Sequence, residues 1–239
     1  MCRMFGMLAA RPVSARALLR DAPRSLWTLS AEHPDGWGVA IDDGDGWAVH
    51  RDTACAQRSA AFEAVAAATR ARVVVAHVRQ KTVGATALAN THPFRCGPLV
   101  FAHNGTVARL DALAAQTSAA RRAAIVGDTD SERLFAFVAT QIDRAGDVER
   151  GVRAAVDALH AGGELGSLNF LLACGRQIYA HRLGRALFVL VRHGAVDDRR
   201  AGTLVVASEP LTDEAWRELP ERSLHVLDAV DGAPVVRAL

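Results

Sequence analysis

The residues Met1-Cys2-Arg3-Met4-Phe5-Gly6 open the chain and decide how the rest of it is interpreted. Methionine aminopeptidase trims Met ahead of small side chains, so Cys2 can become the first residue and carry a free α-amino group. The pKa of an α-amine is roughly 7.7–8.0, so part of it is unprotonated at neutral pH and can accept the thiol's proton, directly or through a water. One residue would then supply both nucleophile and general base. The alternative is an incidental small residue in a strand, because cysteine usually behaves as a small hydrophobe.

Length and composition are typical of a globular protein with a sizeable core. The chain has 239 residues, of which 50% are hydrophobic and 23% charged, as expected for one domain spanning residues 1–239. The net charge of +2 is too small to indicate a nucleic-acid partner. No apolar run approaches the roughly 20 residues that a membrane span needs, and Arg3, Arg11 and Arg16 interrupt any signal peptide. We therefore expect a cytoplasmic protein with no membrane contact.

The cysteines and histidines indicate no metal centre. The four cysteines lie far apart with no CxxC pair, which argues against a zinc knuckle or a disulfide framework: Cys2, Cys55, Cys96 and Cys174. No histidine pair has helix-ligand spacing together with a carboxylate. We expect no metal and no cofactor.

Hydrophobic patterning predicts strands, then helices, then strands. We expect a short helix that Pro12 and Ser14 open and that runs through Leu18 and Leu19, and a capping box in which Thr129 precedes Glu132. Early strands are expected at 4–10, 37–41, 47–50, 72–78 and 99–102, and helices at 59–70, 109–124, 130–144 and 148–160. Late strands are expected at 168–174, 177–182, 186–192, 203–207, 224–230 and 234–238. This order fits two antiparallel sheets between helix layers, an α+β fold.

Polar residues follow several of the expected strands, and each also has a structural interpretation. Arg79 suits a solvated strand end, Asn104-Gly105 suits a turn, and Asp130 suits the first turn of a helix. His92, before Pro93, is typical of a packing or loop-anchoring histidine.

Taken together, these residues resemble one family. Met1-Cys2 followed by an apolar strand, then AHVRQKTVG, NTHPF, AHNGTV and GDTDSE in this order, are similar to the class II glutamine amidotransferases of the N-terminal nucleophile hydrolase superfamily. The later stretches LNFLLACGRQIYAHR and VVASEPLTDEAW resemble the stand-alone members, which include the YafJ-like proteins and the hydrolase that removes glutamate during ergothioneine synthesis. The resemblance implies a four-layer αββα sandwich of two antiparallel sheets.

The resemblance also implies roles for individual residues. Cys2 would attack the γ-carboxamide carbon of a glutaminyl group, and Asn104 and Gly105 would stabilise the oxyanion. Arg79 would pair with the substrate α-carboxylate and Asp130 with its α-ammonium, so that a free amino-acid head is selected. Two further candidates for substrate contact are Thr82, near Arg79, and Trp37, in the segment 35–38.

The sequence departs from synthase-type relatives beside Arg79. Those relatives carry tryptophan and histidine where this chain has Gln80 and Val83, so the leaving group could be larger than ammonia. Three hypotheses remain. The chain is a stand-alone hydrolase of glutamine or a small γ-glutamyl metabolite, a glutaminase subunit that supplies ammonia to a separate synthase, or a non-catalytic glutamine-binding domain. Retention of Met1 would favour the last.

Overall fold

A computed structural model describes residues 2–42, 44, 46–163, 165–192, 202–230 and 233–239. Met1, whose removal the expected role of Cys2 requires, lies outside the described residues. The strands among them are β1 Arg3–Ser14, β2 Trp37–Asp42, β3 Trp47–Asp52, β4 Arg70–Val78, β5 Phe94–Cys96, β6 Leu99–Val107, β7 Gly166–Cys174, β8 Gln177–Arg182, β9 Phe188–Arg192, β10 Thr203–Ala207, β11 Arg217–Glu218, β12 Ser223–Val230 and β13 Ala233–Ala238.

The helices form two groups along the chain. The first comprises η1 Ala17–Asp21, α1 Leu26–Leu29, η2 Ala56–Arg58, α2 Ala60–Ala68 and the later turn η3 Leu88–Asn90. The second comprises α3 Leu110–Gln116, α4 Ala119–Ala123, α5 Asp130–Ala145 and α6 Val148–Ala161. Among the helices of the described residues, none is long and apolar enough to span a membrane.

The described strands build two sheets in which every pairing is antiparallel. One sheet has the order β11-β9-β10-β1-β4-β2-β3 and the other the order β13-β12-β8-β7-β6-β5. The β-branched run at 72–78 is the centre of β4, which lies between β1 and β2 and is buried on both faces from Val73 to Val78. The strand predicted at 72–78 is therefore confirmed, and it lies in the interior of its sheet.

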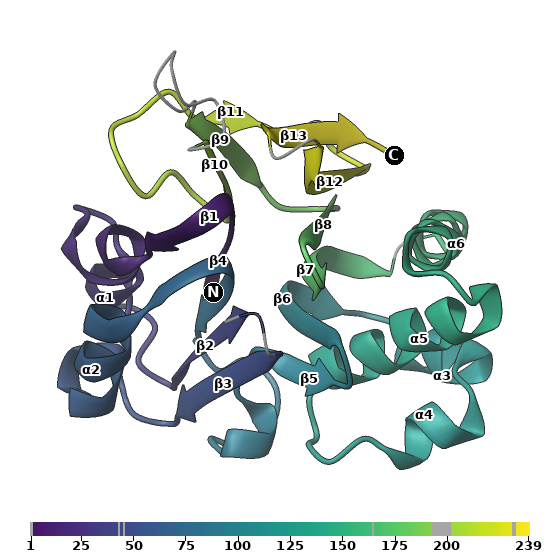
Figure 1. Cartoon of the computed structure of the whole chain (residues 1–239). Coiled ribbons are helices and arrows are strands. Elements are labelled where there is room, and N and C mark those ends of the chain that lie inside the picture. Colours follow the sequence, from purple (N-terminus) through teal and green to yellow (C-terminus); the bar gives the residue numbers. More distant parts are fainter. Residues whose placement is uncertain (1, 43, 45, 164, 193–201, 231–232) are drawn as a thin grey trace.

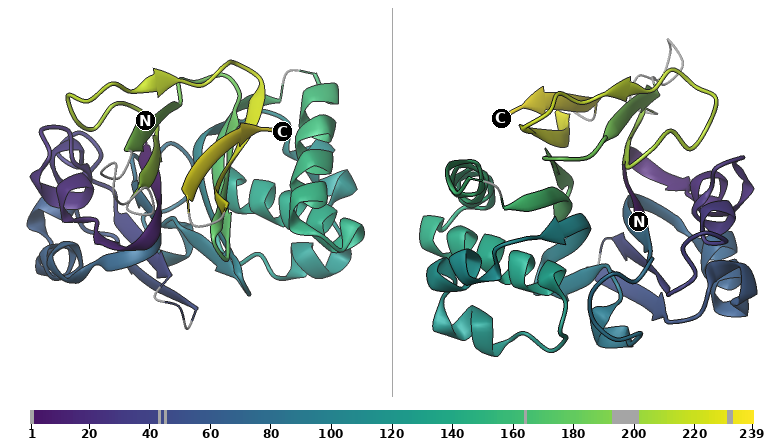
Figure 2. Two further views of the ribbon diagram at one scale, coloured as in Figure 1. Left: turned by 45° about the horizontal axis from the view of Figure 1, so that its top comes forward. Right: turned by 180° about the vertical axis from the view of Figure 1, so that it is seen from behind.

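Three separate hydrophobic cores show that the molecule has four layers. One core lies between the first sheet and α1 and α2, a second between the two sheets, and a third between the second sheet and α3, α5 and α6. Figure 1 shows α1 and α2 on one side of the paired sheets and α3 to α6 on the other, with the start of β1 near the centre. The views of Figure 2 show the same layers from other directions. The predicted α+β sandwich of two antiparallel sheets is confirmed.

Two local predictions were wrong. The short helix expected through Leu18 and Leu19 is present as η1, but Pro12 and Ser14 lie inside β1 instead of opening it, because the register shifts after Leu8 and the end of β1 pairs with the start of β4. The helix expected at 109–124 is broken at residues 117–118. There the Ser118 hydroxyl accepts a hydrogen bond from the N–H of Arg121 and starts α4.

Only half of the predicted capping box forms at the start of α5. The hydroxyl of Thr129 accepts a hydrogen bond from the N–H of Glu132, at 3.3 Å. The Glu132 carboxylate, however, accepts hydrogen bonds from the N–H groups of Val126 and Gly127, at 2.9 and 2.7 Å, instead of reaching back to the cap. This arrangement fixes the loop that leads into Asp130.

Candidate active site

Cys2 lies at the open end of the space between the sheets. Met4 and Leu8 belong to the core between the sheets, and the alternation of side chains along a strand directs Cys2 the same way. Its Sγ lies 3.4 Å from the N–H of Gln80, which donates to it, and 3.5 Å from the Gln80 carbonyl oxygen. Burial raises the pKa of the half-buried Cys2 thiol, while the Gln80 N–H and the charge of Arg79 act in the opposite direction. The thiol therefore needs a base to become a nucleophile at neutral pH.

Arg79 directly follows β4 and holds the next loop. Its buried guanidinium donates to the carbonyl oxygens of Val83 and Ala85, both at 2.9 Å. Its own backbone pairs with the segment 35–38, since its N–H donates to the Gly36 carbonyl at 2.8 Å. Arg79 is thus not a solvated strand end, and its fork retains further N–H donors beside Cys2.

Asn104 and Gly105 lie within β6 and not in a turn, because that strand continues to Val107. Val100 and Ala102 face the space between the sheets, so Asn104 faces it as well, and β1 and β6 pack against each other. Asn104 is buried, and its side-chain amide makes no hydrogen bond within the described residues. The NH₂ group of Asn104 can therefore donate to a bound oxyanion.

Two strands approach each other so closely at Gly105 that a side chain would not fit there. A Cβ atom at this position would lie 1.8 Å from the backbone oxygen of Ser167 on β7 and 2.8 Å from Nε2 of His103. These atoms are mainly backbone, which cannot rotate away. The absence of a side chain lets β7 pass directly beside the residue predicted to supply a backbone N–H.

Asp130 and its neighbour tie the start of α5 to β6. One Asp130 oxygen accepts the N–H of Val107 at 2.8 Å, and the other accepts the N–H of Ser131 at 2.9 Å. His103 Nε2 lies 3.2 Å from the Ser167 carbonyl and Nδ1 lies 2.8 Å from the Ser131 hydroxyl. A carbonyl only accepts, so Nε2 carries the proton and the hydroxyl donates to Nδ1. Burial lowers the pKa of His103, against the opposing charge of Asp130, so the ring is neutral.

Thr82 and Trp37 differ in position from the other predicted site residues. Thr82 is exposed, on the loop held by Arg79. Trp37 is fully buried in the core between the first sheet and the helices, where its ring meets Phe62 edge-on with centroids 5.1 Å apart. The structure therefore groups Cys2 with Arg79 and places Trp37 on the opposite face of the sheet.

His77, on β4, and His92, which precedes β5, form a buried pair. Their rings are tilted by 32° with centroids 4.3 Å apart, and within the described part of the chain their ring nitrogens have no hydrogen-bond partner. Burial lowers the pKa of both rings, that of His77 to about 3, so both are neutral. The expectation that His92 packs instead of acting as a base agrees with this position.

Sequence reasoning missed the residues that hold these elements in place. Asn169 on β7 donates to the carbonyls of Arg185 and Ala186 and accepts the N–H of Leu183, and Glu209 binds the side chain of Arg3. Asn169 belongs to the stretch LNFLLACGRQIYAHR, which the resemblance also singled out without assigning it a role. Glu209 belongs to the stretch VVASEPLTDEAW, which the resemblance singled out without assigning it a role.

A separate cavity lies away from the predicted site residues. A cavity of about 420 Å³ opens between β3, β5 and the α4–α5 segment, and its lining includes Arg51, Phe94, Arg121 and Phe135 but none of the predicted site residues. Within the described residues, no group of three or more His, Cys, Asp or Glu side chains is arranged to hold a metal ion.

Fold and site together place a cysteine directly before the first strand of a four-layer sandwich of two antiparallel sheets. The family model for glutamine amidotransferases class-II matches residues 1–197. The chain belongs to this family of enzymes.

Known proteins similar to this chain agree with the assignment. It is 33% identical to a gamma-glutamyl-hercynylcysteine sulfoxide hydrolase of Mycobacterium tuberculosis, over 100% of this chain and 97% of the relative. It is 28% identical to the putative glutamine amidotransferase YafJ of Escherichia coli, over 92% and 94%. A solved class-II glutamine aminotransferase domain protein from Silicibacter pomeroyi has the same fold, with a TM-score of 0.69, 21% identity, and coverage of 100% and 99%.

Proposed function

We propose that the chain is an N-terminal-cysteine amidohydrolase that cleaves the γ-amide bond of glutamine or of a small γ-glutamyl metabolite. The observation that carries the proposal is the position of the Cys2 thiol. It lies at the end of the first strand, held by the backbone of Gln80 and adjacent to the guanidinium of Arg79. The name of the Mycobacterium tuberculosis relative, a γ-glutamyl hydrolase, supports the same reaction class.

In the proposed reaction, the amine of Cys2 takes the thiol proton and the sulfur attacks the γ-carbonyl carbon. The C=O electron pair moves to oxygen, and the oxyanion accepts hydrogen bonds from the Asn104 amide and the Gly105 N–H. The C–N bond then breaks, and the proton held by the Cys2 amine passes to the leaving amine. A γ-glutamyl thioester remains.

Water completes the cycle. The Cys2 amine accepts a proton from the water as its oxygen attacks the thioester carbon, and the C–S bond breaks with return of the proton to sulfur. Glutamate is released and the thiol is regenerated. The raised thiol pKa fits this scheme, because a protonated thiol and an adjacent amine exchange one proton in each half of the cycle.

Recognition of the amino-acid head is assigned to Arg79 and Asp130, and Thr82 is a further candidate for substrate contact. The existing hydrogen bonds hold Arg79 to the loop carbonyls and Asp130 to backbone N–H groups, so both charges are oriented before substrate binds. The guanidinium would bind the α-carboxylate and the carboxylate would bind the α-ammonium.

The first experiment is the intact mass of the purified protein before and after treatment with a glutamine-mimicking diazoketone. We expect a mass without Met1 and one adduct. Cys2→Ala should give no adduct, whereas Cys55→Ala, which removes another half-buried thiol, should keep it. Retained Met1 with no adduct would refute the nucleophile and favour the glutamine-binding alternative.

A substrate panel separates the two enzymatic alternatives. A stand-alone hydrolase should release glutamate from γ-glutamyl amides with a substituted nitrogen at least as fast as from glutamine. A glutaminase subunit that serves a separate synthase should use glutamine alone and accelerate when that partner is added.

A further inference from the structure

An N-terminal nucleophile is joined to the protein by only one peptide bond. Chain ends fray unless other contacts tie them down. The first strand begins at Arg3, so Cys2 precedes the first residue of the β1 ladder. The contacts of its carbonyl group and its thiol therefore decide whether the residue keeps one orientation.

The Cys2 carbonyl is held by the next side chain. Nη1 of Arg3 donates to the Cys2 carbonyl oxygen at 3.1 Å. The Nε atom of the same guanidinium donates to the carboxylate of Glu209, which follows β10. Arg3 thus connects the nucleophile's backbone to an acid more than 200 positions away in the sequence.

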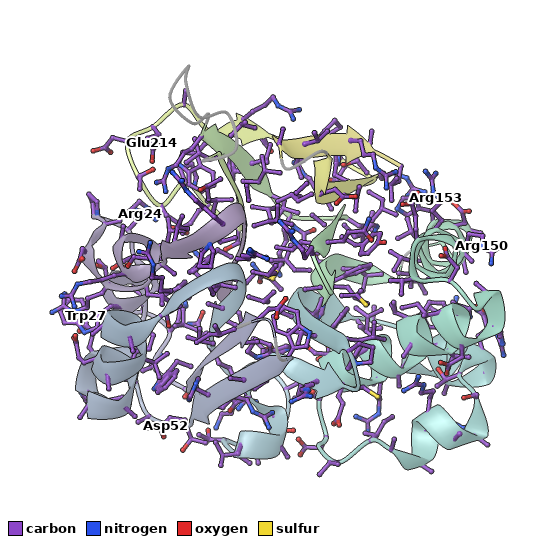
Figure 3. All side chains as sticks on the ribbon, viewed as in Figure 1. Arg24, Trp27, Asp52, Arg150, Arg153 and Glu214 are labelled. Atoms are coloured by element: carbon purple, nitrogen blue, oxygen red, sulfur yellow. The ribbon has the colours of Figure 1, made fainter. Side chains whose placement is uncertain are left out.

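Glu209 also contacts an exposed arginine. Its second oxygen accepts a hydrogen bond from Nε of Arg24, at 2.8 Å. The Glu209 side chain is 13% exposed, whereas that of Arg24 is 57% exposed. Figure 3 shows Arg24 at the periphery of the molecule. Arg24 therefore contacts the carboxylate from outside and does not touch Cys2.

The neighbouring Ser208 fixes the backbone two residues beyond the nucleophile. Its N–H donates to the Met4 carbonyl at 3.0 Å, and its hydroxyl accepts the Met4 N–H at 3.1 Å. The pair Ser208-Glu209 therefore holds both the main chain and the side chain that lead into Cys2.

The geometry of a tetrahedral carbon then fixes the remaining group. The Cα of Cys2 bears the carbonyl carbon, the Cβ that carries sulfur, and the amine nitrogen. Arg3 holds the carbonyl oxygen at 3.1 Å, and the backbone of Gln80 holds the sulfur at 3.4–3.5 Å. With both of these groups held, the direction of the bond from Cα to the amine nitrogen is determined. If the carbonyl were free, the amine could rotate away from the attack geometry while the sulfur stayed in place.

We propose that Glu209 is a positioning residue that, through Arg3, orients the Cys2 carbonyl and thereby aims the α-amine of the nucleophile. This inference rests on the proposed function for its catalytic consequence, but its structural consequence can be measured without turnover.

The kinetic test compares three variants of the mature protein. Glu209→Ala should lower kcat about 10- to 100-fold, because misplacement by about 1 Å costs rate on that scale, with KM changed less than about 3-fold. Glu209→Gln should lose about 10-fold or less, since its amide oxygen can still accept from Arg3. Arg24→Ala is the matched control and should keep kcat within about 3-fold, because it breaks the outer ion pair of the same carboxylate.

Hydrogen exchange of the amino-terminal peptide separates this proposal from the proposed function. Glu209→Ala should speed exchange at the amides of Arg3 and Met4 about 10-fold or more, whereas Arg24→Ala should leave it near the wild-type rate. Unchanged exchange in Glu209→Ala, or an equal loss of kcat in Arg24→Ala, would overturn the positioning role. Faster exchange in a protein whose wild type hydrolyses no γ-glutamyl compound would support the tether and refute the proposed function.

Discussion

Replacing Gly105 with alanine should push β7 away from β6. The added Cβ would lie 1.8 Å from the backbone oxygen of Ser167 and 2.6 Å from its carbonyl carbon. Contacts of this kind are not tolerated below roughly 3 Å, so the strands must separate locally by about 1.2 Å. That shift is about a quarter of the usual spacing of roughly 4.8 Å between paired strands.

The same shift affects stability and the proposed oxyanion site together. Overpacking of this size costs about 1–3 kcal/mol of unfolding free energy, with more expected here because the obstacle is backbone. It also displaces Asn104 and the Gly105 N–H relative to Cys2, and a displacement of about 1 Å can cost about 100-fold in rate. Gly6→Ala on β1 is the matched control. Its Cβ would meet only side-chain atoms of Ile178 and Val206, at 3.2 Å, so we expect a smaller loss.

Urea unfolding of both variants, followed by assay of γ-glutamyl hydrolysis, tests this reasoning. Gly105→Ala should unfold at a distinctly lower urea concentration than Gly6→Ala and hydrolyse substrate far more slowly. The account of Gly105 is refuted if its alanine variant is as stable as the Gly6 variant and keeps wild-type turnover.

Three further outcomes are expected. Asn104→Ala should lower turnover by about 10²–10³, measured as kcat, because one oxyanion donor is lost, and an unchanged kcat would contradict that role. Arg79→Ala should chiefly raise KM for γ-glutamyl compounds, and a fall in kcat alone would argue against substrate binding. Burial lowers the pKa of His77 and of His181 to about 3, so between that value and 6.5 the unfolded chain binds more protons than the folded one. The contribution of these neutral histidines to the free energy of unfolding is therefore largest above pH 6.5 and should fall by about 1 kcal/mol per histidine between pH 7 and 5.5. A urea midpoint that stays constant across this range would contradict this expectation.

Local sequence patterns correctly predicted the elements that depend mainly on residues close to one another in the chain. β2 and β3 match the strands predicted at 37–41 and 47–50, and β4 was visible in its run of valines. The start of α5 was visible in Thr129. In some of these elements the defining hydrogen bonds form within a few residues, and in others an apolar run is buried on both faces. In both cases the local amino-acid composition is enough to predict the element.

Long-range pairing decided what the sequence patterns missed. The end of β1 is a strand because Val13 and Ser14 pair with residues at the start of β4, and no local feature records that pairing. The face on which Trp37 lies was equally hidden. Because side chains alternate along a strand, its pairing with Val78 sends the indole to the helix side of the sheet. The motif suggested substrate contact, but register determined the position.

The pKa shifts at the candidate site give information that the sequence motifs do not contain. A cysteine that acts as a free thiolate needs a lowered pKa, yet burial raises the pKa of the Cys2 thiol. The nearby histidines are poor substitute bases, since burial lowers the pKa of His77 and of His103 and the lone pair of His103, on Nδ1, already accepts the Ser131 hydroxyl. In the proposed mechanism the base must therefore come from Cys2 itself, which makes its orientation, and the contacts that fix it, as important as the thiol.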